Sequence, residues 1–321
     1  MTFALAPDRS PTPSAATSLA VALNQGVGAV LAGRHEQIEV ATACVLAGGH
    51  VLIEDIPGVG KTLLAQTIAA AIGGSFARVQ GSADLLPADV VGSLAPAADG
   101  FGLHFRPGPV FANVVLFDEL NRANPRTQSA LLEVMEEGRV TVDGDTHPVP
   151  TPFVVMATQN PVEMAGTYAL AEGVTDRFMA AISLGRATAA EEVEVLTGRR
   201  GRGRLAHVQQ VTNPGDLAAC RAAVQHTHLA DAVAQYAVEL LHATRNHPRV
   251  RLGASTRAGV AMIALARSFA VMGGRDHVAP HDIARAAACA LPHRLVLATR
   301  ERGAAGEVVN ECLAQVPAPR R

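Results

Sequence analysis

Five short runs of apolar residues mark the first half of the chain, and helical patterns separate them. The runs are residues 50–55, 75–80, 113–119, 152–160 and 177–184. Apolar character is continuous within each run instead of alternating, which is typical of strands buried on both faces. Such strands, separated by helices, belong to a parallel sheet that helices cover. The pattern therefore predicts an α/β domain built on a parallel five-stranded sheet.

Two segments interrupt this alternation with a different signal. Asp143 and Gly144 lie between two short β-prone runs, and Asp99 and Gly100 precede apolar residues on alternate positions. Asp-Gly is a strong hairpin signal because both central residues of the turn need positive φ. Since neither segment extends the parallel sheet, we expect two inserted β-hairpins at its rim.

The second half of the chain changes to helical periodicity. Two groups of apolar residues recur at helical spacing, from Leu229 to Leu241 and from Val260 to Val271. These predict a small all-α domain at the C-terminal end. Between the two halves lies the stretch GRRGRGR, residues 198–204. We interpret it as a hinge loop, because one short basic run is weak evidence for a phosphate or nucleic-acid contact.

The first residues are rich in Pro, Ser, Thr and Ala, which indicates a flexible leader. The predicted organisation is a leader at 1–20, an α/β domain at 21–185, a hinge at 186–206 and a helical domain at 207–321.

Composition and charge exclude several classes of protein. The net charge is −2 and the pI is about 6.6, so the chain lacks the basic footprint of a general nucleic-acid or anionic-membrane binder. Its four cysteines contain no C-x-x-C pair, which is typical of a reducing compartment. No apolar run has the length of a membrane span. We expect a cytoplasmic protein without membrane or nucleic-acid partners.

A strand, a glycine turn and an Ala-rich helix follow one another around residues 50–71, which is the context of a P-loop. The glycines let backbone N–H groups point at phosphate oxygens, and the helix N-terminus favours negative charge. Lys61 is the only lysine in the chain. Its compact ammonium suits the β- and γ-phosphates, where the broad fork of arginine would not fit. The candidate nucleotide-binding residues are Asp55, Pro57, Gly58, Val59, Gly60, Lys61, Thr62 and Leu63.

Polar residues stand at the ends of two further apolar runs. Asp118 and Glu119 end the run at 113–119, and ligands gather at the C-terminal ends of strands in open α/β sheets. With the hydroxyl of Thr62, Asp118 is a candidate Mg²⁺ ligand, and Glu119 is a candidate general base for the attacking water. Asn160 could orient that water, or it could simply form the turn before Pro161.

At residues 116–144 and 157–178 the chain closely resembles the MoxR family of AAA+ ATPases. The likeness extends through LLPADVVGS (85–93), FRPGPVFAN (105–113) and GASTRA (253–258). The generic P-loop pattern has glycine where Asp55 stands, but Asp is common there in this family. The resemblance implies an AAA+ P-loop core with two inserted hairpins, followed by an all-α lid domain.

The resemblance also implies roles for single residues. Asn160 matches the first sensor, Arg177 matches the arginine finger that reaches the neighbouring subunit's nucleotide, and Arg257 matches the lid-domain sensor. From the residues alone, Arg177 could instead form a local ion pair with Asp176. Ser255 is a plausible N-cap that would aim Arg257 toward the cleft between the domains. Relatives usually carry Pro where Thr256 stands.

As a whole, the resemblance implies an ATPase that uses ATP and Mg²⁺, assembles into a homo-oligomeric ring of six, and remodels, matures or activates client protein complexes. A partner with a von Willebrand A domain is typical of the family. Three other functions stay open at this point: a motor subunit of a metal chelatase, a DNA-directed motor, and a non-catalytic scaffold switched by nucleotide. The low net charge speaks against the DNA motor, and Glu119 speaks against the scaffold.

Overall fold

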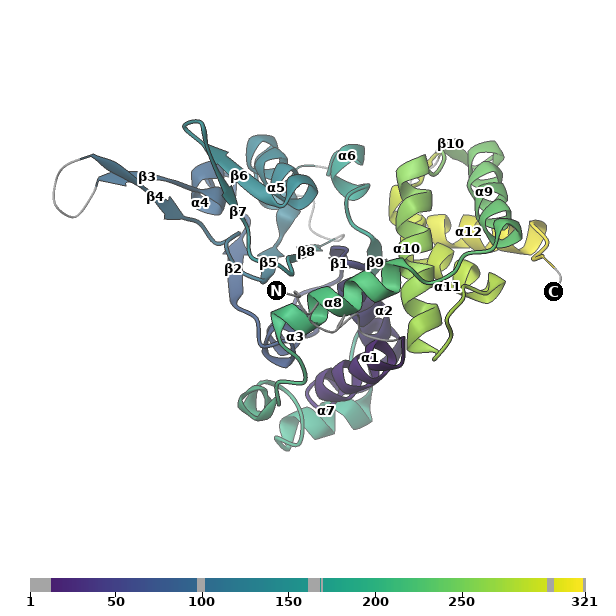
Figure 1. The fold of residues 1–321 in the computed structure, drawn as a ribbon, viewed down its shortest axis with the longest axis horizontal. Coiled ribbons are helices and arrows are strands. Elements are labelled where there is room, and N and C mark those ends of the chain that lie inside the picture. Colours follow the sequence, from purple (N-terminus) through teal and green to yellow (C-terminus); the bar gives the residue numbers. More distant parts are fainter. Residues whose placement is uncertain (1–12, 97–101, 161–167, 169, 299–302, 320–321) are drawn as a thin grey trace, which may run out of the picture.

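The fold is described from a computed structural model that covers residues 13–96, 102–160, 168, 170–298 and 303–319 (Figure 1). The five predicted runs form the strands β1 (Val51–Glu54), β2 (Phe76–Gln80), β5 (Val114–Asp118), β8 (Val154–Gln159) and β9 (Ala180–Ile182). They lie in one sheet in the order β2-β5-β8-β1-β9, and all neighbours are parallel. The predicted sheet is confirmed.

Helices cover this sheet on both faces. The first part of the chain contributes α1 (Pro13–Gly28), α2 (His35–Ala47), α3 (Lys61–Ala71), α4 (Pro87–Val91), the 3-10 turn η1 (Leu120–Arg122), α5 (Pro125–Glu137) and α6 (Glu172–Thr175). Alternate residues of β1 enter two different cores. Val51 and Ile53 pack in the same core as α1, α2 and α3, whereas Leu52 faces the core that contains Leu131 of α5. Burial on both faces explains the continuous apolar runs.

Both predicted hairpins are present among the described residues. β3 (Gly92–Pro96) pairs antiparallel with β4 (Leu103–Pro107), and this ribbon projects from the body of the molecule (Figure 1). Its predicted turn at Asp99 and Gly100 lies outside the described residues. β6 (Arg139–Val142) pairs with β7 (Asp145–Pro148) across Asp143 and Gly144, which both have positive φ as predicted. Phe105 stacks on His147, so the two hairpins touch.

The C-terminal part is helical, as predicted. It contains α7 (Ala189–Leu196), the 3-10 turn η2 (Arg202–His207), α8 (Pro214–Gln225), α9 (Asp231–Asn246), α10 (Thr256–Met272), α11 (Pro280–Ala290), the turn η3 (Pro292–Arg294) and α12 (Ala304–Gln315). The sequence pattern did not anticipate a short antiparallel pair, β10 (Val250–Leu252) with β11 (Val296–Leu297). In the described part of the chain, no helix combines the length and apolarity that crossing a membrane requires.

The predicted leader is wrong from residue 13 onward. Residues 13–20 belong to α1, whose Ala16, Leu19 and Ala20 are buried. Thr17 Oγ1 also donates to the carbonyl of Val271 on α10 at 2.6 Å. Composition suggested disorder, but these apolar residues recur at helical spacing and bury a stripe that stabilises the helix. Residues 1–12 lie outside the described residues.

The predicted hinge at 186–206 is also more ordered than expected. Thr188 caps α7 by accepting from Glu191 N, while the Glu191 carboxylate accepts from Thr188 N, a reciprocal capping box. α8 then packs against α1 and α2 as well as α10. The domain boundaries, including the start of the lid at 207, stay predictions.

Candidate functional site

The P-loop joins the end of β1 to the start of α3. Gly58 and Gly60 both have positive φ, at 87° and 102°, which turns the chain directly into the helix that begins at Lys61. The Lys61 side chain is buried, and its Nζ donates to the carbonyl of Asp55 at 2.8 Å. The loop therefore holds its one ammonium group against its own backbone, where a phosphate could replace or share that contact.

Asp55 has a different position from the rest of the loop. Its carboxylate accepts from Ile56 N at 2.9 Å, from Gly185 N at 2.7 Å and from Ser183 Oγ at 3.2 Å. These contacts fasten the start of the P-loop to the segment that follows β9. Asp55 is buried and does not line the cavity described below. Val59 packs against the core and does not line that cavity either.

The ends of neighbouring strands bring the other candidates together. Asp118 ends β5 and Asn160 follows β8, which lies between β5 and β1 in the sheet. Thr158 Oγ1 donates to Asp118 Oδ1 at 2.7 Å. The guanidinium of Arg78 on β2 donates to Asp118 Oδ2, also at 2.7 Å. The candidate Mg²⁺ ligand is thus fixed by both adjacent strands.

Glu119 has a strained backbone. Its φ of 56° and ψ of 52° place a non-glycine residue in the left-handed region, which is uncommon and concentrates at functional sites. Its N–H donates to Thr158 Oγ1 at 2.8 Å. Its Oε2 accepts from Gln80 Nε2 at 3.0 Å and from Arg122 at 3.2 Å. Gln80 and Arg122 therefore fix the position of the Glu119 carboxylate at the end of β5.

These residues surround one open cavity of about 430 Å³. Its lining is Pro57, Gly58, Gly60, Lys61, Thr62, Leu63, Gln66, Arg78, Gln80, Asp118, Glu119, Asn160 and Arg202. Nine of these were predicted from the sequence. The cavity combines backbone N–H donors at a helix N-terminus, an ammonium, two guanidinium groups, two carboxylates, a hydroxyl and three side-chain amides. This set suits a phosphate chain accompanied by a divalent cation.

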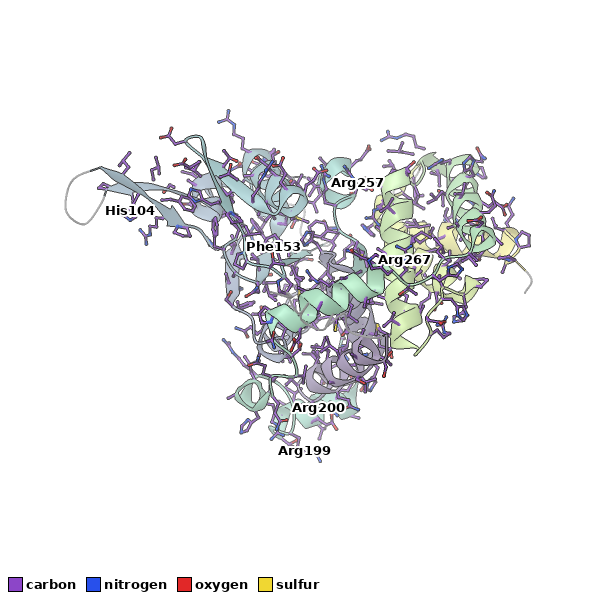
Figure 2. All side chains as sticks on the ribbon, in the orientation of Figure 1. His104, Phe153, Arg199, Arg200, Arg257 and Arg267 are labelled. Carbon is purple, nitrogen blue, oxygen red and sulfur yellow. The ribbon has the colours of Figure 1, made fainter. Side chains whose placement is uncertain are left out.

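Arg177 and Arg257 do not line this cavity. They meet instead at the C-terminal end of α5, where both guanidinium groups contact the carboxylate of Glu136. Arg257 Nη2 lies 3.1 Å from Glu136 Oε1. Figure 2 shows Arg257 beside α6, far from Arg199 and Arg200 at the α7 end of the molecule. Arg257 of α10 thus contacts α5, between the two parts of the chain, and its role as the lid-domain sensor stays a prediction.

Asp176 explains this placement. Its carboxylate accepts from Ser255 Oγ at 3.2 Å and from Arg294 Nε at 3.0 Å, and Arg257 Nη1 lies 3.7 Å away. Because these groups occupy Asp176, the adjacent Arg177 pairs with Glu136 and not with Asp176. The Arg177 Nε is buried without a partner among the described residues. Ser255 does cap α10, as predicted, by accepting from Ala258 N at 3.0 Å.

Sequence reasoning missed four lining residues, Gln66, Arg78, Gln80 and Arg202. Gln80 ends β2, which lies beside β5 in the sheet. Because ligands gather at the C-terminal ends of such strands, the reasoning that identified Asp118 applies equally to Gln80. Arg78 and Gln66 carry no such signal, because only the three-dimensional arrangement turns them toward the loop. Arg202 lies in the basic stretch, which we interpreted as a hinge.

Comparison with known proteins adds an independent line of evidence. Residues 50–180 match the ATPase family associated with various cellular activities (AAA), and residues 242–312 match the AAA lid domain. The uncharacterized protein YeaC of Bacillus subtilis is 42% identical over 296 residues, covering 91% of this chain and 92% of that protein. Chaperone MoxR1 of Mycobacterium tuberculosis is 39% identical over 277 residues, covering 84% and 73%.

One solved structure has the same fold over nearly the whole chain. A protein from Cytophaga hutchinsonii, described as a candidate ATPase, superposes with a TM-score of 0.85 at 33% identity. The match covers 96% of this chain and 97% of that one. The α/β core and the helical lid therefore recur together in a relative.

Proposed function

The chain belongs to the MoxR family of AAA+ ATPases, and from this premise we propose that it binds ATP with Mg²⁺ and hydrolyses it to ADP and phosphate. The observation that carries the proposal is the cavity in which Lys61 and Thr62 face Asp118 and Glu119. The ends of three adjacent parallel strands bring these groups together.

Each lining group has a role in this reaction. The N–H groups of residues 58–63 and the ammonium of Lys61 bind the phosphates. Glu119 accepts a proton from the attacking water, and Asn160 orients that water toward the terminal phosphate. Gln80 and Arg122 hold Glu119 until the nucleotide is in place.

The donor set of the cavity also fits a magnesium ion. The Thr62 hydroxyl and the Asp118 carboxylate offer hard oxygen atoms on the same cavity wall, and Mg²⁺ binds such atoms together with phosphate oxygens and water. Bound there, the ion would neutralise charge on the phosphate chain. Thr158 holds Asp118 Oδ1, whereas Arg78, which pairs with Oδ2, is about half exposed and can move aside.

Completion of the site requires a second copy of the chain. By their resemblance to the family, Arg177 and Arg257 match its finger and sensor positions, yet both contact Glu136 and lie outside the cavity of their own chain. We place them against the nucleotide that a neighbouring copy holds. Head-to-tail contacts of this kind close into rings, and the family resemblance favours six subunits.

The work done with the energy of ATP is remodelling of partner proteins. One relative, 39% identical, is named a chaperone. The projecting β3–β4 ribbon touches the second hairpin through Phe105 and His147, so a change at one hairpin reaches the other. Client protein complexes, including partners with a von Willebrand A domain, are the proposed targets.

Substitution of the candidate base tests the catalytic proposal. Glu119→Gln keeps the shape of the side chain but cannot accept the proton, so the variant should bind ATP as tightly as the wild type while turnover falls at least about a hundredfold. Binding is measured by calorimetry and turnover by phosphate release, with Glu133→Gln on the exposed side of α5 as the control. Equal turnover in the Glu119→Gln variant and the wild type would refute the role of Glu119.

A further inference from the structure

The basic stretch at 198–204 is fastened over the loop between α1 and α2. Arg200 donates to the carbonyl of Gly28 and pairs with Glu194 at 2.9 Å. Gly201 N donates to the carbonyl of Val30 at 3.0 Å. The sequence suggested a mobile, solvated hinge, but in the structure its central residues are bound to the α/β domain.

Gly201 sets the direction in which the next side chain leaves. It is buried, and its φ of 95° lies in a region that side-chain-bearing residues rarely adopt. The 3-10 turn η2 begins immediately afterwards, with Arg204 N donating to the Gly201 carbonyl at 2.9 Å. This turn packs against α3, the helix that begins at Lys61. The geometry places Arg202 on the wall of the cavity that Lys61 and Thr62 also line.

Arg202 differs from the other two cations that line the cavity in its hydrogen bonds and ion pairs. Lys61 is bonded to the Asp55 carbonyl, and Arg78 is paired with Asp118. Among the described residues, Arg202 makes no hydrogen bond or ion pair, and its side chain is exposed. Of the three cations that line the cavity, Arg202 is therefore the one that no described residue of the protein engages.

We propose that Arg202 binds the phosphates of the nucleotide held by its own chain. The inference rests on the proposed function and adds a residue to it. A guanidinium offers several donors in a fixed plane, which matches phosphate oxygens. Arg257 contacts Glu136 and does not line the cavity, so it supplies no cation there. Arg202 supplies one instead, from the segment that leads to the lid. Phosphate binding and the position of this segment are therefore linked.

Arg204 provides a matched control within the same stretch. It lies two residues further on, and it lines a separate cavity with Gln25 and Gly26 of α1. Both arginines are exposed, so their substitution by glutamine removes the same charge from the same turn. Only the substitution at 202 removes it from the phosphate cavity.

Calorimetric titration of the full chain with Mg-ADP tests the proposal. Arg202→Gln should bind about tenfold more weakly than the wild type, since one charge-assisted hydrogen bond is lost, and Arg204→Gln should bind as the wild type does. Arg202→Lys should recover part of the loss because it restores the charge. The melting temperature without nucleotide should be the same in all of these proteins.

The outcomes separate this inference from the function on which it rests. If Lys61→Ala abolishes binding while Arg202→Gln binds like the wild type, the role of Arg202 is wrong and the nucleotide site stands. Equal losses at 202 and 204 would also overturn the inference, because they would indicate a general charge effect. If the wild-type chain does not bind Mg-ADP, the proposed function itself fails.

Discussion

Lys61 shows how much depends on a single side chain in this molecule. Every other residue of the Lys+Arg total is arginine, yet an ammonium stands at the start of α3. The Lys61 side chain is buried there, and its Nζ contacts the Asp55 carbonyl. A planar guanidinium at this position would be broader than the contact that the loop provides. The retained residue is explained by the shape of the site and not by its charge alone.

Lys61→Arg tests that explanation directly. Because the charge is kept and only the shape changes, the affinity for Mg-ATP should fall at least about tenfold. The measurement is equilibrium titration with nucleotide, with Arg199→Lys, at an exposed position, as the reverse control. Unchanged affinity in the Lys61→Arg variant would mean that charge alone is required there.

His50 is a second residue of interest, because its buried environment makes folding stability depend on pH. Its Nδ1 accepts from Val155 N at 2.9 Å, and its Nε2 lies 3.3 Å from the Met135 carbonyl. Burial lowers the pKa of His50 to about 4. The unfolded chain takes up this proton near pH 6.5, so between these values the unfolded state binds more protons and folding stability falls as the pH falls.

The expected loss from His50 is about 3 kcal/mol of unfolding free energy between about pH 6.5 and pH 4. Urea unfolding at a series of pH values measures it. His50→Gln should flatten the acid side of the profile, and His104→Gln, on the exposed projecting hairpin, should leave the profile unchanged. A profile in the His50→Gln variant as steep as that of the wild type would show that His50 titrates normally.

At the level of elements, Asn113, just before β5, links three strands of the sheet through its side-chain hydrogen bonds. Asn113 Oδ1 accepts from Ser75 N at 3.0 Å and Ser75 Oγ at 3.1 Å. Its Nδ2 donates to the Pro152 carbonyl at 2.9 Å. The side chain is buried and joins the starts of β2, β5 and β8. Their opposite ends carry Gln80, Asp118 and Asn160, so the register of the site depends on this junction.

Asn113→Ala should therefore cost about 1–3 kcal/mol of unfolding free energy, because it leaves the buried Pro152 carbonyl without its donor and removes two hydrogen bonds from Ser75. The shift of the urea midpoint in circular dichroism measures the cost. Asn246→Ala, at the exposed end of α9, should change stability by less than about 0.5 kcal/mol. Equal stability of the two variants would show that water replaces the Asn113 contacts.

The sequence predicted the elements better than it predicted their relations. Buried parallel strands leave continuous apolar runs in the sequence, so the sheet was predictable. The residues that directly follow or end these runs can also be read from the sequence, so the P-loop and the pair of Asp118 and Glu119 were predictable too. The pairing of Arg257 with Glu136 was not, because these residues lie 121 positions apart in the sequence and only the fold brings them together. α1 was missed in part, since a helix that packs on α10 is stabilised by residues far away in sequence.

At the scale of the whole molecule, hydrogen bonds join the helical lid to the segment around Arg177, residues 176–179. Arg294 of η3 has a side chain only 2% exposed, and it donates to the Asp176 carboxylate, to the Asp176 carbonyl and to Met179 O. A movement of the lid would therefore shift Arg177 directly. In the single chain both candidate arginines are held by Glu136, so they must leave this carboxylate to reach a neighbouring nucleotide.

In the proposed assembly, one copy of the chain binds the nucleotide and the next copy completes the site. Arg177→Ala protein retains the cavity but lacks the finger, and Glu119→Gln protein retains the finger but lacks the base. Arg177→Ala alone should release phosphate at least about tenfold more slowly than the wild type, because it lacks the proposed arginine finger. Glu119→Gln alone should release it at least about a hundredfold more slowly, because it lacks the general base. A chain with both substitutions, mixed with Arg177→Ala protein, offers no complete site and is the control.

The most direct test is phosphate release by an equimolar mixture of the two single variants. A head-to-tail interface combines an intact cavity with an intact finger in one of four random pairings, so the mixture should recover roughly a quarter of the wild-type rate. A mixture that stays as slow as its components, or Arg177→Ala protein that hydrolyses ATP at the wild-type rate alone, would contradict the account.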